Sequence, residues 1–152
     1  MKSLIIALVV LISVPMVSQT DTEIKWYTNL EEAKKIAKQE HKPILLYFTG
    51  SDWCAPCIQL KQDFFTHPDF IAKAKDMILV EIDVPRRIDI VSPEQLAYNK
   101  EILGQYNQEK AFPKLIALNH KGRVQEDISG YGSLRDPRNY FDLLNRYWAK
   151  YN

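Results

Sequence analysis

The hydrophobic positions of the chain fall into short unbroken runs separated by longer segments with helical spacing. The runs at 44–49 and 77–84 are bounded by polar or turn-forming residues, as is typical of strands buried on both faces of a sheet. A third run at 114–118 is followed by a turn at 119–122 and a returning strand at 123–128, which together indicate a hairpin. These patterns predict four strands.

Helices are predicted between and around the strands. Asn29 is a favourable N-cap for the first of them. Ser92, Pro93 and Gln95 form the start of another, with Ser92 and Gln95 as the two polar members of a capping box, and Gly104 is expected to stop it. We predict helices at 30–41, 54–65, 68–75, 93–103 and 136–151.

Strands that alternate with helices predict an α/β fold, in which helices cover both faces of a central mixed sheet. The closing hairpin supplies an antiparallel edge. The chain has 152 residues and shows no internal repeat, so we expect one domain.

The composition is that of a globular protein, with 46% hydrophobic and 26% charged residues. The formal net charge is only +1, which gives no electrostatic basis for nucleic-acid binding. We therefore expect no nucleic-acid partner, and partners that are not selected by bulk charge.

The N-terminus has the pattern of a signal peptide. Lys2 precedes an apolar run at 4–12, and polar and turn-forming residues up to Ser18 end it. We predict that 1–18 is a signal peptide and that 19–152 is the exported domain, periplasmic or secreted. The alternative is an uncleaved membrane anchor, although the apolar run is short for a membrane span.

Both cysteines lie in one motif, Trp-Cys-Ala-Pro-Cys at 53–57, between a buried strand and a helix. Disulfide exchange needs a thiolate, a second thiol within reach and access for the substrate. Cys54 at the helix start faces unpaired N–H groups and the positive end of the helix dipole, which stabilise a thiolate, while Cys57 lies one turn further in. A purely structural disulfide across three residues would stabilise the fold least, because the loop it closes is so short.

Other uses of the cysteines are disfavoured. A structural zinc site normally needs four ligands, and His41, His67 and His120 show no ligand spacing to the cysteine pair. Covalent haem attachment would need a histidine directly after Cys57, but that residue is Ile58. We therefore expect no metal.

The chain resembles the thioredoxin superfamily over about 26–151. The resemblance rests on the buried strand, the Trp-Cys-x-x-Cys motif with its helix, and Phe112–Pro113 before the terminal strand–strand–helix unit. The segment 48–54, with Asp-Val-Pro at 83–85, is most similar to exported bacterial thioredoxin-like proteins and to the thioredoxin-like domain of bacterial transmembrane disulfide reductants.

The resemblance implies a thioredoxin-like fold and a thiol–disulfide oxidoreductase. Cys54 would be the nucleophile and Cys57 the resolving thiol. Trp53, Phe112 and Pro113 would contact the substrate, with Pro113 in the cis form. The redox-active Cys54–Cys57 disulfide would need no other cofactor.

The expected partners are protein thiols and disulfides in the export compartment, together with a membrane electron-donor reductase. The Ala-Pro pair at 55–56 lacks the histidine of strongly oxidising relatives, which favours a reductant over an oxidant. With no evident dimerisation segment, a monomer is expected.

The chain departs from the family pattern below the cysteines. The position six residues before Cys54, where the family has a buried acid, is Phe48, and the position of the acid's lysine partner corresponds to Leu79. Glu81 and Asp52 are the candidates for accepting the proton of the resolving thiol.

These departures leave a second hypothesis open, a non-catalytic binding module whose disulfide is structural. Trp53 and Phe112 would then be ordinary packing residues and Pro113 a strand-start proline. Tyr131 could line the site or pack its own loop. Arg86, Arg87 and Lys61 are expected to be solvated.

Overall fold

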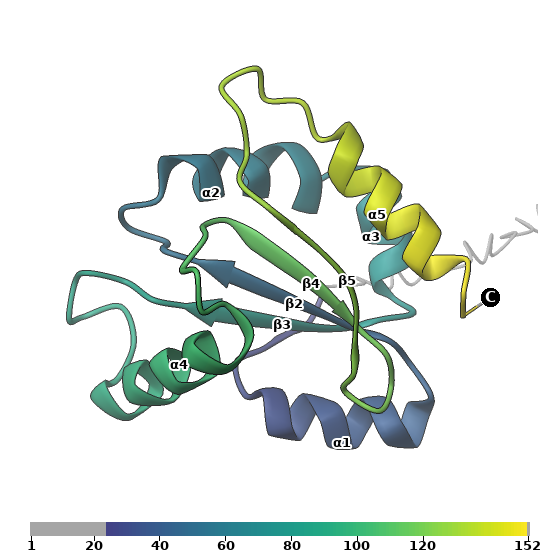
Figure 1. The fold of residues 1–152 in the computed structure, drawn as a ribbon, viewed down its shortest axis with the longest axis horizontal. Coiled ribbons are helices and arrows are strands. Elements are labelled where there is room, and N and C mark those ends of the chain that lie inside the picture. Colours follow the sequence, from purple (N-terminus) through teal and green to yellow (C-terminus); the bar gives the residue numbers. More distant parts are fainter. Residues whose placement is uncertain (1–23, 152) are drawn as a thin grey trace, which may run out of the picture.

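A computed structural model of the chain describes residues 24–151 (Figure 1). Its five strands form one sheet in the order β1-β3-β2-β4-β5. The first three strands of that order are parallel, whereas β4 is antiparallel to β2 and β5 is antiparallel to β4. The strands are β1 (Trp26–Tyr27), β2 (Ile44–Thr49), β3 (Ile78–Asp83), β4 (Lys114–Leu118) and β5 (Val124–Ser129).

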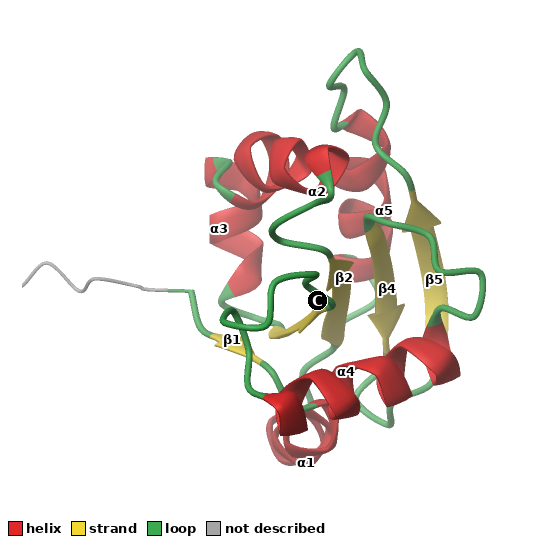
Figure 2. Cartoon of the chain, turned by 90° about the vertical axis from the view of Figure 1, so that its left-hand side faces the viewer, coloured by secondary structure: helices red, strands yellow, loops and turns green. Residues whose placement is uncertain are grey.

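Helices cover both faces of this sheet (Figures 1 and 2). One face packs against α2, η1, α3 and α5, and the other against α1 and α4. The helices are α1 (Leu30–Glu40), α2 (Ala55–Leu60), the π-helical turn η1 (Lys61–Phe65), α3 (Pro68–Ala74), α4 (Pro93–Tyr106) and α5 (Arg138–Trp148). The predicted mixed α/β architecture is confirmed.

Strand β2 is central and every residue in it is buried. Because side chains alternate along a strand, Leu45 and Tyr47 join the core beneath α2 and α5, whereas Leu46 and Phe48 join the core beneath α1 and α4. The unbroken apolar run at 44–49 is thus explained by a sheet with helices on both sides.

The predicted elements are mostly confirmed. Helix α5 is shorter at both ends than the predicted 136–151, and three further differences occur. Strand β1 was missed, since two residues are too few for any periodicity. Helix α2 continues into the π-turn η1, which places both Phe64 and Phe65 in the core. Helix α4 does not stop at Gly104 but continues to Tyr106.

The helix caps follow the predicted chemistry. Asn29 accepts a hydrogen bond from the amide of Glu32, and Ser92 accepts one from the amide of Gln95. The capping box at Ser92 is only half formed, because the Gln95 side chain donates to the carbonyl of Thr28 instead.

The predicted signal peptide at 1–18 lies outside the described residues. Within residues 24–151, no helix is both long and apolar enough to cross a membrane.

Candidate active site

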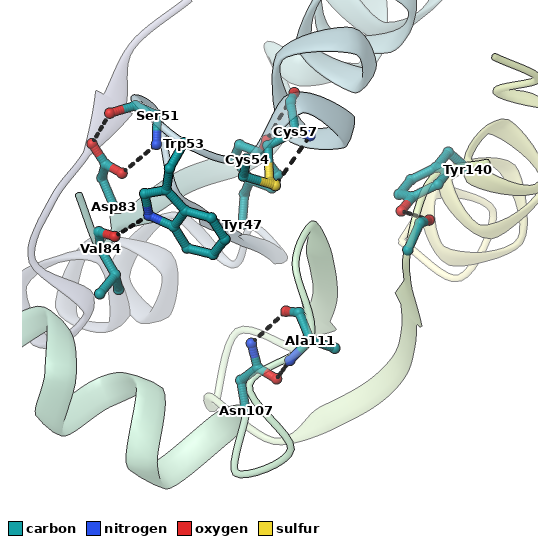
Figure 3. Close-up of a disulfide and its surroundings, with 11 residues drawn as sticks. Tyr47, Ser51, Trp53, Cys54, Cys57, Asp83, Val84, Asn107, Ala111 and Tyr140 are labelled. Atoms are coloured by element: carbon teal, nitrogen blue, oxygen red, sulfur yellow. Dashed lines mark hydrogen bonds between the residues drawn. A yellow bond between two sulfur atoms is a disulfide. The ribbon is translucent and has the colours of Figure 1, made fainter. Parts of the chain in front are cut away.

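Cys54 and Cys57 form a disulfide where the chain leaves β2 and enters α2 (Figure 3). Their Cα atoms are 5.2 Å apart. Cys54 is the N-cap of α2, and its Sγ accepts a hydrogen bond from the amide of Cys57 at 3.3 Å. The residues are 3% and 1% exposed, so Cys57 is the more enclosed of the two.

This geometry favours a thiolate at Cys54 in the reduced protein. The amide of Cys57 is directed at the Cys54 sulfur, and the first turn of a helix presents unpaired N–H groups and a positive dipole end. Both stabilise a negatively charged sulfur.

Trp53 is held rigidly beside the disulfide. Its indole N–H donates to the carbonyl of Val84 at 2.9 Å, and its ring packs edge-on against Phe112 with the ring centres 5.2 Å apart. Arg86 is exposed, as predicted, and its guanidinium also lies 4.6 Å from the ring centre in a cation–π contact that the sequence did not indicate. Gly50 leaves room for this ring, since a Cβ there would lie 2.2 Å from it.

The Phe112–Pro113 peptide bond is cis, as predicted. The carbonyl of Pro113 accepts a hydrogen bond from the amide of Gly130 at 2.8 Å. The loop that leads to this bond is fixed by Asn107, which is fully buried and exchanges two hydrogen bonds with the main chain of Ala111. Nothing in the local sequence distinguishes Asn107 from an ordinary polar helix-end residue.

Tyr47 lies beneath the disulfide. Its hydroxyl donates to the carbonyl of Cys57 at 3.3 Å, and its burial raises its pKa. Phe48 lies six positions before Cys54, where the family has its buried acid. Its side chain faces the core on the other side of the sheet, beneath α1 and α4. The position under Cys57 is therefore taken by Tyr47, whose partner on β3 is Glu81 and not Leu79.

The two candidate proton acceptors differ. Burial raises the pKa of Glu81; Lys61 opposes this effect and Asp83 adds to it, so the pKa remains above its ordinary value. The carboxylate of Asp52 is occupied by the main-chain amides of Arg86 and Arg87 at 2.9–3.2 Å.

Desolvation raises the pKa of Asp52, but these hydrogen bonds outweigh it and leave the pKa low. Asp52 thus joins two loops beside the site, and its lowered pKa makes it a weaker proton acceptor than Glu81.

Tyr131 packs its own loop. Its hydroxyl donates to Asp63 at 2.8 Å, and its ring packs edge-on against Tyr140. The guanidinium of Arg135 also binds Asp63, so the segment after β5 is tied to η1. Of the two roles considered for Tyr131, loop packing is the one observed.

Comparisons with known proteins agree with this arrangement. A family model described as thioredoxin-like matches residues 25–119. Disulfide bond reductase DsbH of Chlamydia pneumoniae is 37% identical over 93 residues, 60% of this chain and 55% of DsbH. Thiol:disulfide interchange protein DsbD of Vibrio vulnificus is 30% identical over 78 residues, 49% of this chain and 13% of DsbD.

A solved structure of a DsbH oxidoreductase is similar to the whole fold. It has a TM-score of 0.69 and 28% sequence identity, and the match covers 90% of this chain and 95% of that one. The match to the curated DsbH sequence spans 55% of that protein's length, and the match to DsbD spans 13%.

Proposed function

This chain belongs to the thioredoxin-like family, and we propose that it is a thiol–disulfide oxidoreductase acting on exported proteins through Cys54 and Cys57. The observation that carries the proposal is the placement of the Cys54 sulfur at the start of α2, where it accepts the amide hydrogen of Cys57. The names of the relatives, a disulfide bond reductase and a thiol:disulfide interchange protein, support it.

In the proposed reaction, the Cys54 thiolate attacks one sulfur of a client disulfide. A mixed disulfide forms, and the other client sulfur leaves as a thiolate that takes up a proton. Cys57 then loses its proton and attacks the Cys54 sulfur, which releases the second client thiolate. Two electrons pass from the protein to the client, and the Cys54–Cys57 disulfide of the structure is the product form.

We infer that the second step is assisted by Glu81. A carboxyl group with a raised pKa is better matched to a thiol as a proton acceptor than an ordinary one. Glu81 pairs in register with Tyr47, whose hydroxyl reaches the Cys57 carbonyl, so it lies on the same face of the sheet as the resolving cysteine.

The proposed direction is reduction of clients. The Ala-Pro pair between the cysteines and the reductase name of one relative support this direction. A reductant outside the cytoplasm must be recharged, so a membrane electron donor is part of the proposal. Trp53, Phe112 and Pro113 are proposed to contact the client, because Trp53 lies beside the disulfide (Figure 3), the Phe112 ring packs against Trp53, and Pro113 follows Phe112 through a cis bond.

Trapping tests the mechanism. We expect Cys57→Ser to accumulate a mixed disulfide between Cys54 and a scrambled disulfide-bonded protein, whereas the matched Cys54→Ser variant accumulates none. A wild-type potential near the thioredoxin value of about −270 mV supports a reductant, and one near −120 mV reverses the direction. A disulfide that exchanges with no thiol would leave the non-catalytic binding module as the function.

A further inference from the structure

A largely apolar pocket of about 410 Å³ lies next to the residues that flank the disulfide in the sequence and in the fold. Two of its walls are Trp53 and Phe112, the residues that immediately precede Cys54 and the cis proline. The opposite wall is the C-terminal part of α4, including Leu103 and Gly104. The pocket is thus continuous with the place where a client disulfide must approach.

Gly104 keeps this pocket open. It lies inside α4, where glycine costs about 1 kcal/mol relative to alanine. Its backbone does not require glycine: its φ is not in the left-handed region, and a Cβ added there would meet no atom within 4 Å. Glycine is therefore needed here neither for a turn nor for a close contact with another segment. Its effect is that no side chain projects from this part of α4 into the pocket.

The charged residues around the pocket are all positive. Lys100 and Lys110 are the charged residues that line it, and among the described lining residues there is no carboxylate. Within residues 24–151 neither lysine forms an ion pair. Arg86, whose guanidinium lies over the Trp53 ring, adds a third cation close to this lining residue.

We propose that this pocket receives an apolar side chain of the client polypeptide close to its disulfide, and that Lys100 and Lys110 favour clients with an acidic residue beside that side chain. The inference rests on the proposed oxidoreductase function and names its substrate class. An extended client chain advances about 3.3 Å per residue, so a side chain within about three residues of the client cysteine reaches a pocket whose walls adjoin Cys54 and Pro113.

A side chain of the client is the occupant that this position favours, because the pocket shares Trp53 and Phe112 with the proposed site of exchange. An apolar residue that fills it would hold the client while the Cys54–client bond forms. The electrons still pass only from the two protein thiols to the client disulfide.

The test uses reduced protein in single turnover against dimeric peptide disulfides. Each peptide has one cysteine in a Ser/Gly chain, with leucine placed in turn at the three positions on either side. Acid quenching and alkylation followed by mass spectrometry give the rate. We expect the best leucine peptide to react about tenfold faster than the all-Ser/Gly peptide, the order of discrimination that a small hydrophobic pocket provides.

The matched variants act on the pocket alone. Gly104→Leu should abolish the leucine preference by filling the pocket, while Gln105→Leu, the same change one residue further on, should leave it intact. Adding glutamate beside the leucine should speed the reaction at low salt. Lys100→Glu/Lys110→Glu should reverse that effect, and the control Lys38→Glu/Lys121→Glu should not.

Hydroxyethyl disulfide, small and uncharged, separates this inference from the proposed function. We expect the wild type and the control variants Gln105→Leu and Lys38→Glu/Lys121→Glu to reduce it at the same rate, and the peptide rates of each pocket variant are divided by its own rate with this probe. Equal rates for leucine and serine peptides, with hydroxyethyl disulfide still reduced, would overturn the pocket inference and leave the oxidoreductase standing. If the wild type reduces neither probe, the proposed function fails and the role of the pocket fails with it.

Discussion

The hydroxyl of Tyr47 donates a hydrogen bond to the main-chain carbonyl of Cys57 at 3.3 Å and so ties the central strand to the second cysteine (Figure 3). Tyr47 is almost completely buried. The same carbonyl also accepts the amide of Lys61 within the helix, so the tyrosine adds a second bond to a group already paired. The contact fixes where α2, and with it the disulfide, lies over the sheet.

Tyr47→Phe should therefore destabilise the oxidised protein modestly. The ring still fills its place in the core, and the Cys57 carbonyl keeps its helical partner, so the loss is about 1 kcal/mol in the free energy of unfolding. Urea unfolding measures it. A loss above about 3 kcal/mol would mean that the hydroxyl does more than this one bond explains.

Glu81→Gln should change how stability depends on pH. Burial raises the pKa of Glu81 above its usual 4.5, so the folded protein binds its proton more tightly than the unfolded chain does. Stability is then full below pH 4.5 and falls as the pH rises from there through the folded pKa. The variant should lack this fall, as measured by urea unfolding between pH 4 and 8.

A second variant, Lys61→Met, tests the same carboxyl group from the side of its neighbouring positive charge. Lys61 lowers the pKa of Glu81, so its removal should raise that pKa further and extend the fall in stability to higher pH. An identical pH profile in wild type and Glu81→Gln would contradict the burial of this carboxyl group. A slower second step in Glu81→Gln, with the first step unchanged, would in addition support its role as proton acceptor.

Asp63→Asn should weaken the attachment of the segment after β5. The hydrogen bonds from Arg135 and Tyr131 hold the pKa of Asp63 below its usual 3.8. This contribution to stability is present above pH 3.8 and is lost as the pH falls through the folded pKa. The variant should be less stable at neutral pH, and the difference should vanish in acid.

A double-mutant cycle with Arg135→Gln checks that prediction. The effects of the two changes should be less than additive at pH 7, because both remove the same ion pair. Hydrogen exchange of the amides at 130–136 should accelerate in each single variant. Additive effects, with no change in exchange at these amides, would show that the pair does not hold the segment.

Much of the site could be predicted because its signals are local in sequence. The spacing of Cys54 and Cys57 and the strand before them need no knowledge of distant contacts. The residue under Cys57 could not be found by counting, because a shift of one position along a strand moves a side chain to the other face of the sheet. Phe48 was inferred in this way, but Tyr47 occupies the place.

The remaining features depend on contacts between distant segments. The stacking of Arg86 on Trp53 joins two loops 33 positions apart in the sequence, and no local pattern encodes it. Gly104 resembles a helix stop in sequence, since glycine usually ends helices. Only the pocket beside it shows why a glycine lies within α4.

Gly50→Ala should displace Trp53. A Cβ at position 50 would lie 2.2–2.5 Å from three atoms of the indole ring, and the ring cannot yield without losing its hydrogen bond to Val84 and its contact with Phe112. Overpacking of this kind costs about 1–3 kcal/mol. We expect that loss in urea unfolding, together with slower reduction of protein disulfides.

Gly132→Ala is the matched control, because a Cβ at position 132 meets no atom within 4 Å and the φ of this glycine is not in the left-handed region. It should leave both stability and exchange within error of the wild type. Trp53→Phe provides the second comparison. The smaller ring loses the hydrogen bond to Val84 but leaves more room for a Cβ at position 50. Gly50→Ala should therefore reduce the free energy of unfolding less in a Trp53→Phe background than in the wild type. An equal reduction in both backgrounds would show that the glycine is needed for the turn and not for the indole ring.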